Sequence, residues 1–248
     1  MNPMYQYQKR ITYYDLDYRG KIKLSALLRM VHEAADVNAK ELGAGFNVLS
    51  PLGMTFVIQR FGVKSTRMPV YDENVVIRTW PSDVSKGTFL RRGDMYDQDG
   101  NKIMEWASLW LLFDINERKV LRPSALPTPL STLGDEGVGV MPIKIAIPQD
   151  DISCGQQFSY YSHQASYRDA DTNMHMNNSI YGDLVGNAIF PVETDAAIPH
   201  PDWSEVQINY LAEIRLGETV DVTALRDRDC FTVIGKSGGR TAFISRVS

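Results

Sequence analysis

The side chains best suited to chemistry lie together at residues 171–178, in the run Asp-Thr-Asn-Met-His-Met-Asn-Asn. Histidine titrates nearest neutrality, and an aspartate can act as a base or a nucleophile or can hold the histidine. A helical pattern follows, so the run is expected at a helix N-terminus, where unpaired N–H groups suit a developing oxyanion. We take the backbone N–H groups near Asn177 and Asn178 as candidate oxyanion donors.

The same run has a counterpart in the first half of the chain. Tyr-x-Asp-x-Asp occurs at residues 13–17 and again at 167–171, and a helix-like segment follows each copy. The first copy carries an arginine and a lysine where the second has Asn173 and His175. Chemistry alone leaves two interpretations equally open: a catalytic cluster, or a polar turn in which Asp171 only repeats a structural role.

The elements that must position these residues form two similar units. Five of the twelve prolines fall within residues 123–150, which predicts a linker at 131–150 between domains at 1–130 and 151–248. Each copy reads as one helix followed by several strands, which indicates an α+β fold with an antiparallel sheet. The helices are expected at residues 24–42 and from 177 or 178 to 190. Strands are expected at residues 56–61, 75–80, 89–96 and 102–113, and at 206–210, 219–225, 231–234 and 241–247.

Composition excludes several other classes of protein. The net charge of -4 argues against a dedicated nucleic-acid binder, and no run approaches the roughly 18 apolar residues that a membrane span needs. Two cysteines cannot form a disulfide framework, and the first residues lack a secretory layout, so a cytoplasmic location is expected. The four histidines lack metal-ligand spacing, so no metal is expected. Gly-Lys-Ser-Gly-Gly at 235–239 is interpreted as a hairpin turn, since no helix can follow it.

Asp-x-Asn-x-His-x-Asn-Asn-x-x-Tyr at residues 171–181 resembles the catalytic-domain signature of acyl-acyl-carrier-protein (acyl-ACP) thioesterases. Residues 79–123 resemble the N-terminal domain of that family, and Tyr210-x-x-Glu213 resembles its late Tyr-x-x-Glu element. The resemblance implies a tandem (double) hotdog fold, in which each unit has a long helix wrapped by a curved antiparallel sheet. It also implies hydrolysis of the thioester of fatty acyl-ACP, which releases free fatty acid and ends fatty acid synthesis on that chain.

The resemblance also implies the catalytic residues: Asp171, Asn173, His175 and Glu213. Plant members have a cysteine directly after the glutamate, where this chain has Ile214. Attack by water, or transient attack by the Asp171 carboxylate, is therefore expected rather than attack by a thiol. No cofactor is implied, because the phosphopantetheine arm belongs to the substrate.

Two weaker sets of residues follow from the resemblance. Because the first copy lines much of the acyl pocket in this family, candidates for the pocket are Met54, Phe56, Ile58, Trp80 and Trp110. The acyl carrier protein is acidic, so candidates for a docking patch are Lys86, Arg91, Arg92, Arg118, Lys119 and Arg122. Either a monomer or a homodimer fits the tandem arrangement. An acyl-coenzyme A thioesterase, a non-catalytic sensor of acyl thioesters and, less well, a hotdog dehydratase remain alternatives.

Overall fold

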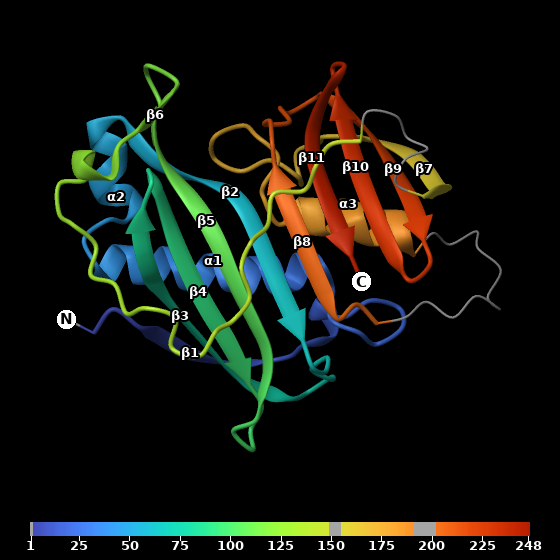
Figure 1. The fold of residues 1–248 in the computed structure, drawn as a ribbon, viewed down its shortest axis with the longest axis horizontal. Coiled ribbons are helices and arrows are strands. Elements are labelled where there is room, and N and C mark those ends of the chain that lie inside the picture. Colours follow the sequence, from blue (N-terminus) through green and yellow to red (C-terminus); the bar gives the residue numbers. More distant parts are fainter. Residues whose placement is uncertain (1, 149–154, 191–201) are drawn as a thin grey trace.

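A single antiparallel sheet forms the frame of the protein. The computed structural model describes residues 2–148, 155–190 and 202–248 (Figure 1). Ten strands follow one another across the sheet, and an eleventh, β6 (Lys119–Leu121), pairs with β5. The order across the sheet is β1 (Tyr5–Arg10), β3 (Asn74–Ser85), β4 (Thr88–Tyr96), β5 (Lys102–Asp114), β2 (Met54–Ser65), β8 (Glu205–Tyr210), β11 (Arg240–Val247), β10 (Cys230–Ser237), β9 (Thr219–Asp227) and β7 (Gln156–Gln164).

The sheet repeats one topology. The first half runs β1-β3-β4-β5-β2 from its edge inward, and the second half runs β7-β9-β10-β11-β8 from the opposite edge. The two halves meet where β2 pairs antiparallel with β8, in a register from Arg60 opposite Asn209 to Lys64 opposite Glu205. The repeat predicted from the sequence is therefore confirmed as a repeat of strand order, and the fold is α+β.

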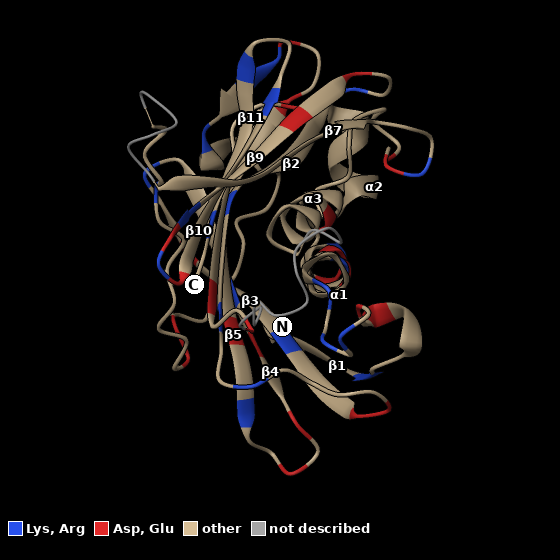
Figure 2. Cartoon of the chain, turned by 90° about the vertical axis from the view of Figure 1, so that its right-hand side faces the viewer, with Lys and Arg blue, Asp and Glu red and all other residues tan. Residues whose placement is uncertain are grey.

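Both long helices cover the same face of this sheet (Figure 2). Helix α1 (Leu24–Glu41) buries one apolar side, and Gly43 follows its end in the left-handed conformation (φ 75°). Helix α3 (Ile180–Ile189) crosses the start of α1 so closely that a Cβ on Gly182 would lie 2.6 Å from the backbone nitrogen of Ser25. A short helix, α2 (Phe46–Leu49), and a 3-10 turn at Ser50–Leu52 precede β2.

The proline-rich segment runs over the opposite face of the sheet (Figure 1). Val138 and Val140 pack on Trp80 and Leu90 there, and the Arg92 guanidinium donates to both of their carbonyl groups. Further along, the side-chain amides of Gln207 and Asn209 on β8 hold the segment. Their oxygens accept the backbone N–H groups of residues 143 (3.1 Å) and 145 (2.9 Å). The linker is thus fastened to the seam between the halves. The domain limits at 130 and 150 stay predictions, and the second falls on residues outside the described ranges.

The sequence patterns predicted most strands but missed the short β6 and the two strands at the sheet edges. The expected runs all lie within β2 to β5 and β8 to β11, whereas β1, β6 and β7 have no counterpart among the predictions. Both edge strands, β1 and β7, mix tyrosine or phenylalanine with polar residues and contain no fully buried residue, so they lack the apolar pattern of the inner strands. Within the described residues, no helix has the length and apolarity that crossing a membrane requires.

The contact between α3 and α1 generates a stability prediction with an internal control. Gly182→Ala places a methyl group against the backbone of Ser25, so we expect unfolding free energy to fall by about 1–3 kcal/mol. Gly186→Ala in the same helix meets nothing within 4 Å and should raise stability by up to about 1 kcal/mol, as alanine favours helices. Denaturant titration of both variants measures this, and equal shifts would contradict the close crossing.

Candidate active site

The loop before α3 is held by its own aspartates. Asp169 accepts the backbone N–H (2.9 Å) and hydroxyl (2.8 Å) of Ser166, which closes the first turn. The backbone N–H of Asp171 then donates to the carbonyl of His175 (2.9 Å), and its Oδ1 accepts the N–H of Asn173 (2.8 Å). Met174 completes this turn in the left-handed conformation, at φ 63°. The Tyr-x-Asp-x-Asp pattern therefore encodes a turn of defined shape.

The first-half counterpart has the same backbone geometry. Asp17 donates its N–H to the carbonyl of Lys21 (2.8 Å), and its Oδ1 accepts the N–H of Arg19 (2.9 Å). Gly20 occupies the position of Met174 and is also left-handed, at φ 74°. One oxygen of each aspartate thus has the same structural role in both copies, which is the interpretation that the repeat suggested.

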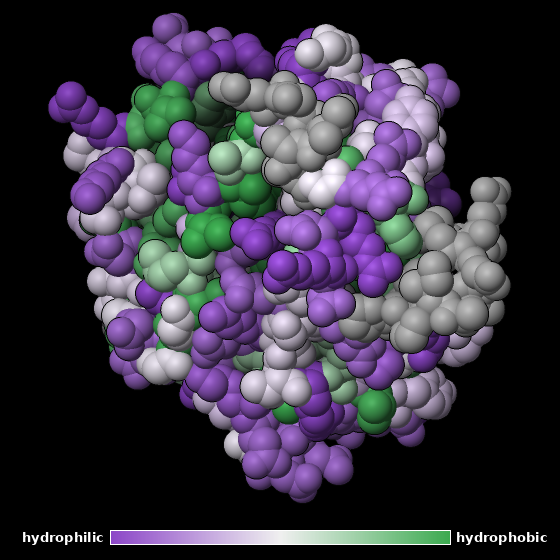
Figure 3. Space-filling view, turned by 45° about the vertical axis from the view of Figure 1, so that its right-hand side comes forward, coloured by the Kyte–Doolittle hydropathy of each residue, from purple (hydrophilic) through white to green (hydrophobic). Residues whose placement is uncertain are grey.

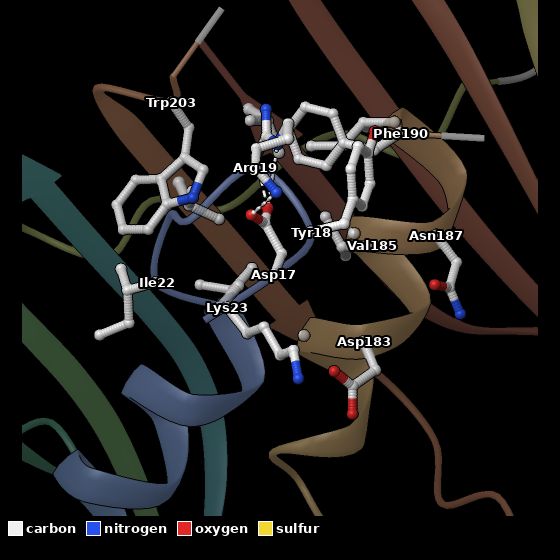
Figure 4. A pocket seen from close by; sticks show the side chains of 16 residues that line it. Asp17, Tyr18, Arg19, Ile22, Lys23, Asp183, Val185, Asn187, Phe190 and Trp203 are labelled. Atoms are coloured by element: carbon white, nitrogen blue, oxygen red, sulfur yellow. Dashed lines mark hydrogen bonds and ion pairs between the residues drawn. The ribbon is translucent and has the colours of Figure 1, made fainter. Parts of the chain in front are cut away.

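The second oxygen distinguishes the two copies. Asp17 Oδ2 accepts Arg19 Nη2 at 2.8 Å, and the guanidinium lies over the Phe190 ring, 3.5 Å from its centre (Figure 4). Arg19 therefore neutralises the first-half carboxylate. Both residues lie in a cavity that Phe190 and Trp203 also line. Asp171 Oδ2, by contrast, has no hydrogen-bond partner among the described residues, and the same holds for the side-chain amide of Asn173.

A short backbone ladder brings His175 to Glu213. Residue 175 forms an antiparallel bridge with Arg215, the N–H of Met176 donates to the carbonyl of Ile214 (2.7 Å), and the N–H of residue 216 donates to the carbonyl of residue 174 (3.1 Å). Glu213 follows the end of β8, and its Oε2 lies 3.3 Å from Nε2 of His175. Both side chains keep partial access to solvent, at 29% for His175 and 25% for Glu213. The two are placed so that the carboxylate can orient the imidazole.

Two arginines hold the other oxygen of this carboxylate. Oε1 of Glu213 accepts Nη2 of Arg215 (2.9 Å) and Nη2 of Arg118 (2.9 Å). Burial raises the pKa of Glu213, but the hydrogen bond from Arg215 and the charges of His175 and Arg118 outweigh it, so the pKa lies below its usual value. Glu213 is therefore ionised at neutral pH.

A buried tyrosine, Tyr181, and a half-buried one, Tyr210, pack behind this arrangement. The hydroxyl of Tyr181 forms a hydrogen bond with the backbone of Ile214, and burial raises the pKa of that hydroxyl. The ring of Tyr181 packs edge-on against Tyr210, whose hydroxyl donates to the carbonyl of Asn178 (3.4 Å). Ile214 itself is fully buried, so this position packs in the core rather than facing the site.

The start of α3 narrows the choice of oxyanion donor. The Oδ1 of Asn177 accepts the N–H (2.9 Å) and hydroxyl (2.8 Å) of Ser179, which closes the turn that leads into α3. The N–H of Asn177 is itself donated to the carbonyl of Asp169 (2.8 Å) and is not available to substrate. The N–H of Asn178 has no acceptor among the described residues and stays the candidate.

An apolar cavity of about 190 Å³ lies between α1, α2 and the first half of the sheet. Of the predicted pocket residues, Phe56 and Trp110 line it, whereas Ile58 is buried in the main core. Met54 packs in the apolar cluster around Leu49 that includes Phe56 and Trp110, but it does not line the cavity. Trp80 lies on the opposite face of the sheet, under the linker, where its Nε1 donates to the carbonyl of residue 134 (2.9 Å). The alternation of side chains along β3 thus turns Trp80 away from the cavity.

Two polar groups that the cavity predictions left out lie in its wall. Arg91 is only 8% exposed and donates to Asn38 Oδ1 (2.8 Å) and Thr79 Oγ1 (3.2 Å), and burial lowers its pKa to about 10. The ring of His32 packs edge-on against Trp110, and its buried Nε2 has no hydrogen-bond partner among the described residues. His32 lies within the helix expected at residues 24–42, but no signal in the sequence marked it as a cavity residue.

The predicted docking cations divide into two groups. Arg91 and Arg92 are buried, the first at the cavity and the second under the linker, so neither can contact a carrier protein. Lys86, Lys119 and Arg122 are exposed at the surface, and Arg118 forms an ion pair with Glu213.

Among the described residues, no group of three or more His, Cys, Asp or Glu side chains is arranged to hold a metal ion.

The burial of His32 generates a pH prediction. Burial lowers the pKa of His32 from 6.5 to about 4, so the folded protein holds it neutral while the unfolded chain protonates it below pH 6.5. Stability should therefore fall as the pH drops from 6.5 to 4, by up to about 3 kcal/mol from this group. Denaturant titrations across that range should show the loss reduced in His32→Leu, and an unchanged pH dependence would refute the assignment.

Comparison with known proteins agrees with this geometry. Residues 2–124 match the family described as the acyl-ACP thioesterase N-terminal domain, and residues 155–238 match the acyl-ACP thioesterase C-terminal domain. No curated protein sequence matches the chain.

Solved structures share the fold over nearly the whole length. An acyl-ACP thioesterase from Bacteroides thetaiotaomicron is 23% identical with a TM-score of 0.85, covering 99% of this chain and 97% of its own. A proposed oleoyl thioesterase from Lactobacillus plantarum is 22% identical (TM-score 0.81, 98% and 94% covered). A 12:0-ACP thioesterase from Umbellularia californica is 17% identical (TM-score 0.79, 100% and 97% covered). The N-terminal and C-terminal family domains match successive parts of the chain, in agreement with its tandem hotdog fold. These matches show that this chain belongs to the acyl-ACP thioesterase family.

Proposed function

We propose that the chain hydrolyses the thioester of fatty acyl-ACP at the pair formed by His175 and Glu213, and so releases free fatty acid. The observation that carries this proposal is the placement of Glu213, whose Oε1 is held by two arginines while Oε2 faces Nε2 of His175 at 3.3 Å. Such a carboxylate orients an imidazole and stabilises it once it has taken a proton. Release of the acid would end fatty acid synthesis on that chain.

In the proposed reaction, water is the nucleophile. With Nε2 of His175 directed to Glu213, the other ring nitrogen is left to take a proton from a water molecule that adds to the thioester carbonyl carbon. The N–H of Asn178, next to the positive end of α3, supports the resulting oxyanion. Collapse breaks the carbon–sulfur bond, and the departing pantetheine sulfur takes the proton back from the imidazole. The products are a fatty acid and the free thiol.

Asp171 and Asn173 have supporting parts in this proposal. Oδ1 of Asp171 is committed to the loop, because it accepts the N–H of Asn173 (2.8 Å). Its Oδ2 and the Asn173 amide, which have no partner among the residues that the structure describes, are left to orient water or the thioester. Transient attack by the Asp171 carboxylate is the alternative, which would use the same free oxygen.

The acyl chain is assigned to the cavity lined by Phe56 and Trp110. Its walls are largely aromatic and aliphatic, as an alkyl chain requires. Both lining residues come from β2 and β5 of the first half, whereas the reacting groups come from the second. This division supports our proposal that the first half sets chain specificity and the second half carries the chemistry.

A carrier protein would dock beside the β5–β6 turn. Lys119 and Arg122 are exposed there, and Ile115 and Val120 expose apolar side chains close by in sequence (42% and 54%). Figure 3 shows hydrophobic residues gathered in the upper left of one face, with hydrophilic side chains around them. A surface that mixes cations with exposed apolar groups suits an acidic protein partner. Acyl-coenzyme A remains the second candidate substrate, since the site recognises the same thioester.

The catalytic assignment can be tested at matched positions of the repeat. We expect His175→Ala and Glu213→Gln to lower turnover of acyl-ACP by about 10²- to 10⁴-fold. The control is Lys21→Ala, because Lys21 is the first-half counterpart of His175 and forms an ion pair with Asp202 at the surface. Release of free fatty acid from carrier protein loaded with a series of chain lengths is the measurement. If no free fatty acid is released at any acyl chain length, the hydrolase function is refuted and a non-catalytic sensor is favoured.

The same assay separates water attack from carboxylate attack. Asp171→Asn keeps an oxygen for the N–H of Asn173, so we expect it to retain far more activity than Asp171→Ala. A loss in Asp171→Asn as large as that in His175→Ala would instead indicate that the Asp171 carboxylate is the nucleophile.

Charge reversal tests the docking surface. Lys119→Glu and Arg122→Glu should raise KM for acyl-ACP several-fold, with little change in kcat and a weaker dependence on salt. Arg228→Glu, at the exposed β9–β10 turn, serves as the control. Steady-state kinetics at low and high ionic strength measure both quantities. Activity on acyl-ACP that stays flat with salt would contradict the patch.

A further inference from the structure

Glu213 is surrounded by charged groups from four elements. Oε1 accepts Nη2 of Arg118 and both Nη2 (2.9 Å) and Nε (3.2 Å) of Arg215, whereas Oε2 faces Nε2 of His175. Nη2 of Arg240, on β11, donates to the main-chain carbonyl of Glu213 (3.1 Å). Arg215 is two residues away, and His175 belongs to the neighbouring loop of the same half. Arg118 alone among these groups comes from the first half of the chain.

The turn that carries Arg118 has a defined shape. It connects β5 to β6, and Asp114 Oδ1 closes it by accepting the N–H groups of Asn116 and Glu117, each at 2.9 Å. The N–H of Ile115 also donates to the carbonyl of Gly53 (2.8 Å), which ties the turn to the start of β2. Arg118 itself adopts the left-handed conformation (φ 50°), which non-glycine residues adopt uncommonly. Observed at a candidate site, this conformation is consistent with a functional constraint.

We propose that Arg118 is a positioning residue, supplied by the first half to hold Glu213 Oε1 so that Oε2 stays directed at His175. This inference rests on the proposed hydrolase function and adds a residue to it. Arg215 is 57% exposed and belongs to the same segment as Glu213, so it can move with the glutamate. A second donor on a separate, fastened turn fixes the direction of the carboxylate, as charge-assisted hydrogen bonds from two sides do.

Contact with an exposed arginine also has a chemical effect. Arg118 is 57% exposed, so its pair with Glu213 should contribute little to folding stability. Its charge nevertheless favours the ionised form of Glu213, which is the form that orients a protonated imidazole. Removing Arg118 should therefore raise the pKa of Glu213 toward its usual value.

The experiment compares Arg118→Gln, Arg118→Lys and wild type on acyl-ACP and on a small acyl-pantetheine thioester that needs no docking. We expect Arg118→Gln to lower kcat about tenfold on both substrates, with KM changed less than twofold. Arg118→Lys should restore part of kcat. The matched control is Arg10→Gln, which breaks an exposed Arg–Asp pair on β1, and thermal unfolding confirms that each variant is folded.

The outcomes separate this inference from the function on which it rests. A wild-type protein that hydrolyses neither thioester would refute the hydrolase itself. An active wild type with an Arg118→Gln variant that matches Arg10→Gln in kcat would refute the positioning role alone. A loss confined to the carrier-protein substrate, expressed in KM, would also overturn it, because Arg118 would then contact the partner rather than the glutamate.

Discussion

The antiparallel pairing of β2 with β8 is the interaction on which the rest of the site depends. It joins the two halves into one sheet, with Arg60 opposite Asn209 and Lys64 opposite Glu205. Only this register brings the β5–β6 turn of the first half beside the end of β8, where Glu213 lies. A one-residue slip would turn every side chain of a strand to the other face. The side chains of Gln207 and Asn209 on β8 also bind the linker, which fastens the seam on the face opposite the helices.

The loops at Asp17 and Asp171 have the same backbone shape but different chemistry. In both, an aspartate oxygen holds the backbone of the turn, which explains why the pattern is repeated. In the first loop, Arg19 neutralises the remaining oxygen and lies on Phe190. In the second, the corresponding oxygen has no partner in the described part of the chain, and His175 replaces a lysine. The difference in reactivity therefore lies in side chains added to a common backbone frame.

The sequence predicted the parts of the structure that local patterns encode. Helix α1, the inner strands and the turn around residues 235–239 follow from apolar spacing and turn residues, and the Asn-x-His difference between copies located the loop. Contacts between distant segments left no such signal. The approach of Arg118 to Glu213 spans 95 positions, and the burial of Arg91 and Arg92 depends on which face of β4 the linker covers. From the sequence alone, a charged residue is expected at the surface. Arg91 and Arg92 were therefore wrongly predicted on a docking surface, although both are buried.

A crystal structure with a non-hydrolysable acyl-pantetheine thioether tests most directly that the second loop, served by both halves, is the reactive site. The proposed arrangement requires the sulfur end to lie between His175 and the N–H of Asn178, with the acyl chain in the cavity lined by Phe56 and Trp110. An analogue bound instead in the counterpart cavity, beside Arg19 and Phe190, would contradict it.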